Sequence, residues 1–202
     1  AQVMVWMVMD IIRILIPKMI SALSWNSSNV PREGYNLRKF IHLNIRKSTL
    51  IIRNHKTGFN IGSIRLSGDL ILAPMDGYSI HPFRILTREL GSAASYSEFI
   101  NARDVINGHP HLEQRLFFTP DEKPFIFQLV DDNPERLLVA AKVLRERNPD
   151  AIDINLGCST PSVSGRGAGA GLLKEPHKIE TILTSLCNNL DIPITAKIRL
   201  GW

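Results

Sequence analysis

Short apolar runs alternate with helical segments from residue 59 to the end of the sequence, and this alternation limits the possible folds more than any other feature. A strand–helix–strand alternation of this kind gives parallel strands joined by right-handed crossovers. We therefore predict an α/β protein with one parallel sheet. The predicted strands are residues 70–73, 93–99, 124–130, 151–154 and 193–200.

Polar side chains follow these strands at their carboxyl ends. In a TIM (β/α)₈ barrel the carboxyl ends converge on one face, which carries the active site. We therefore expect a TIM barrel, of which this sequence supplies about the first five strands. The polar residues at successive ends are Asp76, Glu98, Gln128, Asn155, Cys158 and Lys197.

The fourth predicted strand leads into the stretch AIDINLGCSTP, residues 151–161. The strand breaks at Asn155 and presents Cys158 in a loop of small and polar residues. Burying an amide and a thiol at a strand end stabilises the core little, whereas loops at strand ends are where α/β proteins place catalytic residues. The alternative interpretation is that this loop is only a tight turn. A free cysteine has a pKa of about 8.5 and is mostly thiol at pH 7, so Cys158 is suited to give a proton. No histidine lies near it in sequence, so a Cys–His nucleophile is not indicated.

The chain has two cysteines, Cys158 and Cys187, and no CxxC pair. This argues against a disulfide framework or a structural zinc site and favours a reducing cytoplasm. We expect Cys187 to pack inside a helix at 175–190. The pattern HxHxE at 109–113 lacks a third ligand at metal spacing, so we interpret it as a solvated loop and predict no metal.

The net charge of +5 is concentrated in residues 1–60, which hold nine Lys and Arg residues against Asp10 and Glu33. The rest of the chain is close to neutral, so net charge is weak evidence for nucleic-acid binding. Charged residues and Pro17 interrupt the apolar residues 1–25, so we expect neither a membrane-spanning helix nor a secretory signal.

The ordered domain is expected at residues 58–202, and residues 1–57 are interpreted as a poorly ordered N-terminal extension. A functional basic arm is the alternative for that extension. The sequence opens on Ala1 instead of Met, which suggests that the true start is missing or misassigned.

Three local patterns complete the prediction. Residues 59–66 have the pattern of a hairpin that leads into a buried strand at 70–73. Ser79 is expected to cap a helix from His81 to Leu90. The glycine-rich run at 165–171 is neither a P-loop nor a dinucleotide fingerprint. We interpret it as a flexible loop and tight helix start, in which Arg166 faces an anionic ligand.

Six segments together carry a resemblance to a known family. In order they are LAPMDGYSIHPFR, SYSEF, FQLV, DINLGC, GRGAGAGLL and TAKIRLGW. From about Phe59 to Trp202 the chain resembles the first part of the FMN-bearing barrel of the tRNA-dihydrouridine synthases. The resemblance implies a cytoplasmic enzyme, monomeric when complete, that reduces the C5=C6 bond of a uridine in tRNA. FMN is the implied hydride carrier and NADPH the implied reductant.

The resemblance also implies roles for single residues. Cys158 would protonate C5 of the uridine, and Asn155 would contact the flipped base. Gln128 and Lys197 would bind the flavin ring. The other implied site residues are Pro74, Met75 and Asp76 at the flavin, and Glu98 and Arg166 at the substrate.

The sequence departs from the family pattern at two positions and in its length. Many members carry Ala at the position of Asp76, and Pro directly after the cysteine, where this chain has Ser159. The resemblance further implies strands with the FMN phosphate site and a helical RNA-binding domain beyond Trp202. Two alternatives stay open: a truncated chain that is inactive or only binds RNA, and another FMN barrel that reduces a free pyrimidine.

Overall fold

The computed structural model describes residues 58–200. By internal contacts the chain divides into two units, Ala1–Arg53 and Asn54–Trp202, and the described residues all belong to the second. The expected N-terminal extension, 1–57, lies outside the described residues.

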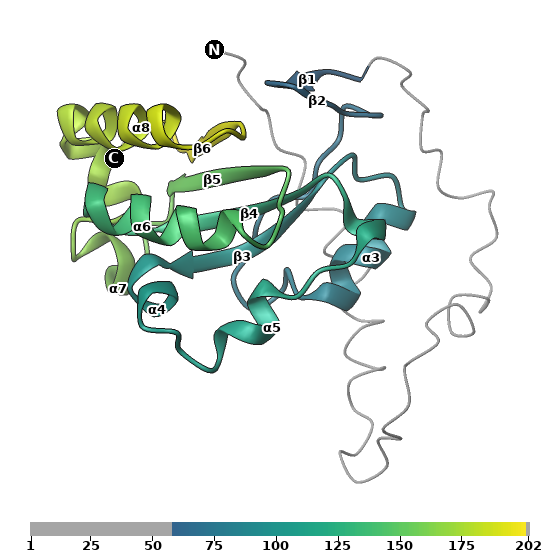
Figure 1. Ribbon diagram of the computed structural model, residues 1–202, viewed down its shortest axis with the longest axis horizontal. Coiled ribbons are helices and arrows are strands. Elements are labelled where there is room, and N and C mark those ends of the chain that lie inside the picture. The colour runs from purple at the N-terminus through teal and green to yellow at the C-terminus, as the bar shows by residue number, and fades with distance from the viewer. Residues whose placement is uncertain (1–57, 201–202) are drawn as a thin grey trace, which may run out of the picture. The chain divides into compact units, whose positions relative to one another are not determined.

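The centre of the described unit is a sheet of four parallel strands in the order β3-β4-β5-β6 (Figure 1). Strands that are consecutive in the chain are neighbours in the sheet, as in one side of a (β/α) barrel. The α/β class and the parallel pairing are thereby confirmed. The bounds are β3 Ser95–Asn101, β4 Phe125–Val130, β5 Ala151–Leu156 and β6 Ile194–Ile198.

Helices α4 (Ala102–Ile106), α6 (Pro134–Arg145) and α8 (Pro176–Asn189) cover one face of the sheet and enclose the larger apolar core (Figure 1). The Asn133 side chain caps α6 by accepting a hydrogen bond from the Arg136 amide at 2.8 Å. The core residues of α6 recur at helical spacing, as predicted, because one stripe of the helix faces the sheet. They are Leu137, Ala141 and Leu144, which were predicted, and Ala140, all fully buried.

The opposite face of the sheet meets a hairpin of β1 (Asn60–Ile61) and β2 (Ile64–Arg65). Tyr96, Ile126 and Ala151 from three strands form a second buried cluster, against which residues of the hairpin pack. Gly62 has a φ of +55° in the hairpin turn, a conformation that favours glycine. The predicted hairpin is confirmed.

The predicted first strand, residues 70–73, is wrong, because this segment pairs with no other strand. Leu70 is 57% exposed. The segment runs beside the start of β3, but the Leu72 amide donates its hydrogen bond to the Ser92 hydroxyl, at 3.1 Å. In a strand ladder this amide would donate to a main-chain carbonyl of the neighbouring strand. Four of the five expected strands are therefore present in the described residues.

Two smaller expectations are also wrong. Helix α3 (His81–Glu89) begins after Ile80, and Ser79 does not cap it. The Ser79 hydroxyl instead accepts the Met75 amide at 2.9 Å and closes the turn before the helix. Cys187 is exposed, because it lies on the outer face of α8 away from Ile182 and Leu186.

A buried ion pair ties α3 to the short helix η1 (Pro120–Glu122). Arg84 is 2% exposed and Glu122 is fully buried; Arg84 Nε donates to Glu122 Oε2 at 2.5 Å. His81 Nδ1 lies 2.8 Å from the other carboxylate oxygen, Oε1. These contacts fix α3 beside the segment that leads from α5 (Leu112–Leu116) into β4.

Within residues 58–200, none of the helices is both long and apolar enough to cross a membrane.

Candidate active site at the carboxyl ends of the strands

A chain of side-chain hydrogen bonds crosses the sheet between β4, β5 and β6. Gln128 Nε2 donates to Asp153 Oδ2 at 2.7 Å, and Thr195 Oγ1 donates to Asp153 Oδ1 at 2.5 Å. Asn155 Nδ2 in turn donates to Gln128 Oε1 at 3.0 Å. Gln128, Asp153 and Asn155 are all less than one tenth exposed. We call these four residues, Gln128, Asp153, Asn155 and Thr195, the polar network.

The polar network ends at the turn that carries Cys158. Asn155 Oδ1 accepts the backbone amides of Gly157 at 3.1 Å and of Cys158 at 2.9 Å. The Cys158 side chain is half-buried, and its Sγ lies 3.2 Å from Thr160 Oγ1. The strand runs to Leu156, two residues beyond its predicted end at Ile154, so Asn155 belongs to β5.

The glycine-rich run packs back on the cysteine turn through helices α7 (Pro161–Ser164) and η2 (Gly169–Lys174). The Ala170 amide donates to the Cys158 carbonyl at 2.9 Å. Gly169 has a φ of +55°, and a Cβ at this position would lie 2.7 Å from the Cys158 carbonyl oxygen. The glycine at this position is therefore required by a close approach of two backbone segments. Arg166 lies in the same loop and is exposed.

Asp153 is the most perturbed carboxyl group of the site. Burial raises its pKa to about 6, although hydrogen bonds from Thr195 and Gln128 and the positive charge of Lys197 act in the opposite direction. Burial, and then the charge of Asp153, raise the pKa of Tyr96, which reaches toward Thr195 from β3. Lys197 is half-buried and is the register partner of Asn155.

A second group of charges surrounds Glu98, which lies in the middle of β3, three residues before the strand ends at Asn101. Arg115 Nη1 is 2.8 Å from Asp76 Oδ1, and Arg115 Nε is 3.7 Å from Glu98 Oε2. Glu98 also accepts the Gly77 amide through Oε1. Arg115 therefore holds two of the predicted site residues together.

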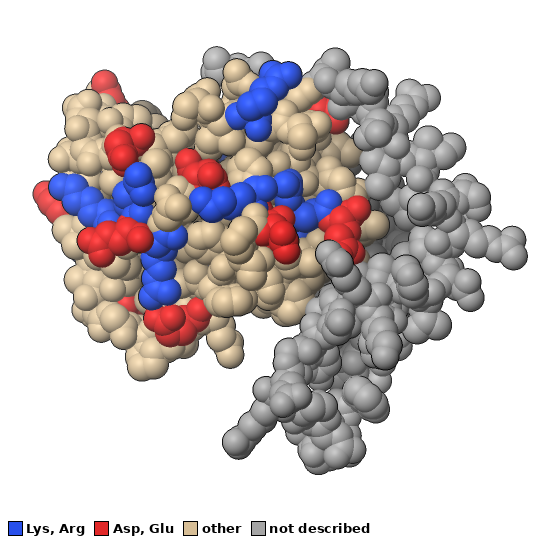
Figure 2. Space-filling view, turned by 45° about the vertical axis from the view of Figure 1, so that its right-hand side comes forward, with Lys and Arg blue, Asp and Glu red and all other residues tan. Residues whose placement is uncertain are grey.

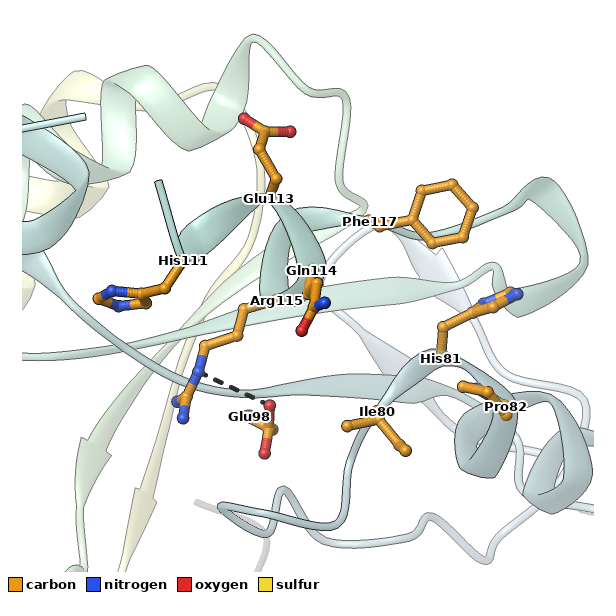
Figure 3. A pocket seen from close by; sticks show the side chains of 9 residues that line it. All are labelled: Ile80, His81, Pro82, Glu98, His111, Glu113, Gln114, Arg115 and Phe117. Atoms are coloured by element: carbon orange, nitrogen blue, oxygen red, sulfur yellow. Dashed lines mark ion pairs between the residues drawn. The ribbon is translucent and has the colours of Figure 1, made fainter. Parts of the chain in front are cut away.

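A cavity of about 860 Å³ opens beside this second group (Figure 3). Ile80, His81 and Pro82 line it from the start of α3, and α5 lines the opposite side with Arg115. The other lining residues are Glu98, His111, Glu113, Gln114 and Phe117.

The register between β3 and β4 shifts between Tyr96 and Phe99. Within this irregularity the Ser97 hydroxyl accepts the Gln128 amide at 3.0 Å, and Glu98 lies at the cavity. Bulges of this kind commonly re-aim side chains next to active sites.

Apart from Arg166, the predicted site residues thus fall into two groups. Gln128, Asn155, Cys158 and Lys197 lie together at the ends of β4, β5 and β6. Asp76 and Glu98 lie at Arg115, and Pro74 and Met75 are half-buried in the segment that precedes Asp76.

Sequence reasoning missed three residues of these groups: Asp153, Thr195 and Arg115. Strand periodicity could have indicated the first two, because Asp153 shares a face with Asn155, and Thr195 with Lys197. No local signal identifies Arg115.

Positive and negative side chains are interleaved on the face drawn in Figure 2. The exposed ion pairs of the described residues include Arg145–Asp191 and Arg147–Glu113. In the described part of the chain, no three His, Cys, Asp or Glu residues are grouped so that they could hold a metal ion. The exposed rings of His109 and His111 lie 4.1 Å apart, centroid to centroid.

The fold and the site define an α/β protein of the parallel-strand type, with a polar network and a cysteine at the carboxyl ends of its strands. Residues 71–202 match the family described as dihydrouridine synthase (Dus). This match covers more than half of the sequence, and the chain belongs to the dihydrouridine synthase family.

Curated relatives agree with this assignment. The chain is 33% identical over 142 residues to tRNA-dihydrouridine synthase B of Escherichia coli K12 and 39% identical over 140 residues to a probable tRNA-dihydrouridine synthase of Aquifex aeolicus. The two alignments cover 70% and 67% of this chain. They span 44% of the length of either relative.

Proposed function

We propose that this protein reduces the C5=C6 bond of a uridine in tRNA and so acts as a tRNA-dihydrouridine synthase. Family membership and the names of the curated relatives support the proposal. The observation that carries it is the position of Cys158: the thiol stands at the end of β5, in a turn that a buried asparagine holds through two backbone amides.

In the proposed reaction the Cys158 thiol gives its proton to C5 of the uracil ring. General acids of this kind contribute about 10²–10⁴-fold to a rate. The half-buried position suits this role, because the sulfur can meet a base that has left its stack while the turn behind it stays fixed. Asn155 keeps one amide N–H beyond its bond to Gln128, and this N–H is proposed to contact the base.

The residues at the ends of β4 and β6 fit a flavin ring. Lys197 supplies a positive charge, and Gln128 keeps one N–H and one acceptor lone pair after its two side-chain bonds in the polar network. FMN, when bound, supplies the hydride that is added at C6, and NADPH is the proposed reductant. Pro74, Met75 and Asp76 are proposed to lie at the flavin, with Asp76 held by Arg115.

The remaining parts of the proposal follow the family resemblance. Glu98 and Arg166 are assigned to the tRNA side of the site. The enzyme is proposed to be a TIM-barrel protein that acts in the cytoplasm as a monomer, without a metal. Its barrel domain begins near residue 58.

The test uses the complete protein with FMN, NADPH and an unmodified tRNA transcript. We expect dihydrouridine in the tRNA, measured by mass spectrometry of nucleosides, and no reduction of free uracil or uridine under the same conditions. Reduction of the free pyrimidine alone would assign the protein to another class of FMN barrel. Absence of any reduced product would overturn the proposal.

A further inference from the structure

We propose that Asp153 is a positioning residue of the site: its carboxylate sets the side-chain orientations of Gln128 and Asn155, and through Asn155 it holds the turn of Cys158. The orientation itself is a property of this fold. Its consequence for catalysis rests on the proposed function.

The orientations follow from what each group can donate or accept. An ionised carboxylate only accepts hydrogen bonds, so the Gln128 side chain must present its NH₂ group to Asp153. The Gln128 carbonyl oxygen then faces Asn155 and accepts from its NH₂ group. The Asn155 oxygen is consequently left to face the amides of Gly157 and Cys158, which need an acceptor. One buried acceptor thus determines two amide orientations and the turn.

The surroundings of Asp153 hold the carboxylate in place. Thr195 from β6 occupies one oxygen and Gln128 from β4 the other, so Asp153 connects three neighbouring strands. Two further groups interact with it electrostatically, Lys197 on β6 and Tyr96 on β3. Asp153 itself is 2% exposed, so water does not compete for these bonds.

The order of hydrogen bonds in the polar network also predicts which substitutions keep the side-chain orientations. In Asp153→Asn the new side chain can still accept from Gln128, because the Thr195 hydroxyl can reverse and accept from the new NH₂ group. In Asp153→Val the acceptor is lost, and the Gln128 side chain keeps only its bond from Asn155 of the two side-chain bonds that hold it. In Gln128→Met the link between Asp153 and Asn155 is lost while the carboxylate remains.

The test measures the reactivity of Cys158 directly. In a Cys187→Ser background Cys158 is the remaining thiol of this sequence, and its rate of alkylation by iodoacetamide is followed between pH 6 and 9. We expect Asp153→Val and Gln128→Met to react about fivefold faster, the factor that one lost hydrogen bond of about 1 kcal/mol represents. Asp153→Asn should match the parent.

Asp131→Asn is the matched control, because Asp131 is a buried carboxylate at the end of β4 that binds Arg136 and lies outside the polar network. It should leave the alkylation profile unchanged. If Asp153→Val fails to fold, Gln128→Met still decides the question. Parental alkylation profiles in the folded variants, or an equal change in the Asp131→Asn control, would overturn the inference.

A second readout separates this inference from the proposed function. In the FMN-loaded enzyme, Asp153→Val should lower kcat for tRNA reduction and leave KM for tRNA unchanged. Altered alkylation in a protein without any reductase activity would uphold the positioning role and reject the proposed function. Active enzyme with parental alkylation and kcat in Asp153→Val would reject the positioning role alone.

Discussion

Asn155 Oδ1 accepts a hydrogen bond from the backbone amide of Cys158 at 2.9 Å. The acceptor belongs to the end of a buried strand and the donor to the half-buried turn that follows it. The position of the cysteine is therefore fixed by the sheet. Asn155, which the resemblance assigns to substrate binding, therefore also holds the cysteine turn in place.

The first prediction concerns this contact. Asn155→Ala leaves the amides of Gly157 and Cys158 without their acceptor, so the free energy of unfolding should fall by about 1–3 kcal/mol. Urea denaturation followed by circular dichroism measures this. Asn188→Ala, on the exposed side of α8, is the control and should change stability by less than about 0.5 kcal/mol. An equal loss in both variants would show that the turn does not depend on Asn155.

The second prediction concerns the flavin. Lys197→Ala should weaken FMN retention, because it removes the positive charge that is proposed to lie near the anionic edge of the flavin. The measurement is the ratio of FMN to protein after gel filtration, with a titration by flavin fluorescence. Lys142→Ala removes an exposed lysine of α6 and should keep the parental ratio. A parental ratio in Lys197→Ala as well would count against the proposed flavin role.

The third prediction concerns pH. Because burial raises the pKa of Asp153 to about 6, the folded protein holds a proton there that the unfolded chain releases near pH 4. This group therefore makes stability fall as pH rises from about 4 to 6, by about 2–3 kcal/mol in total. Asp153→Asn should remove that component. Unfolding free energies at several pH values measure it, and identical pH dependences in the two proteins would contradict the assignment.

The fourth prediction concerns the ion pair beneath α3. Glu122→Gln leaves the guanidinium of Arg84 buried with its charge uncompensated, and should cost about 3–5 kcal/mol of stability. Glu113→Gln breaks an exposed pair with Arg147 and should cost less than about 1 kcal/mol. Thermal unfolding of both variants compares them. Similar losses would mean that burial does not strengthen the inner pair.

The sequence predicted the parallel sheet because its strands are short segments dominated by apolar residues. Phe125–Val130 and Ala151–Leu156 are buried along their whole length. It failed at residues 70–73, where the apolar pattern is equally good. Whether such a segment joins a strand ladder depends on the segment beside it. At residues 70–73 the Leu72 amide donates its hydrogen bond to the Ser92 hydroxyl. Local sequence carries no information about that contact.

The site was predictable to a similar degree. Strand ends identified Gln128, Asn155 and Cys158, because polar residues at those positions interrupt apolar runs. Asp153 lies inside a strand, and its importance appears only when Gln128 and Thr195 approach from neighbouring strands. Buried charges such as Arg84 were missed for the same reason, since their partners are distant in sequence.

The most direct measurement of the central claim is dihydrouridine formation by FMN-loaded Cys158→Ala in unmodified tRNA with NADPH. We expect normal FMN content and a rate lower by about 10²–10⁴-fold, the range for loss of a general acid. Cys187→Ala, which removes the exposed cysteine of α8, should keep the parental rate. Parental turnover by Cys158→Ala would remove the cysteine from the mechanism and contradict the account.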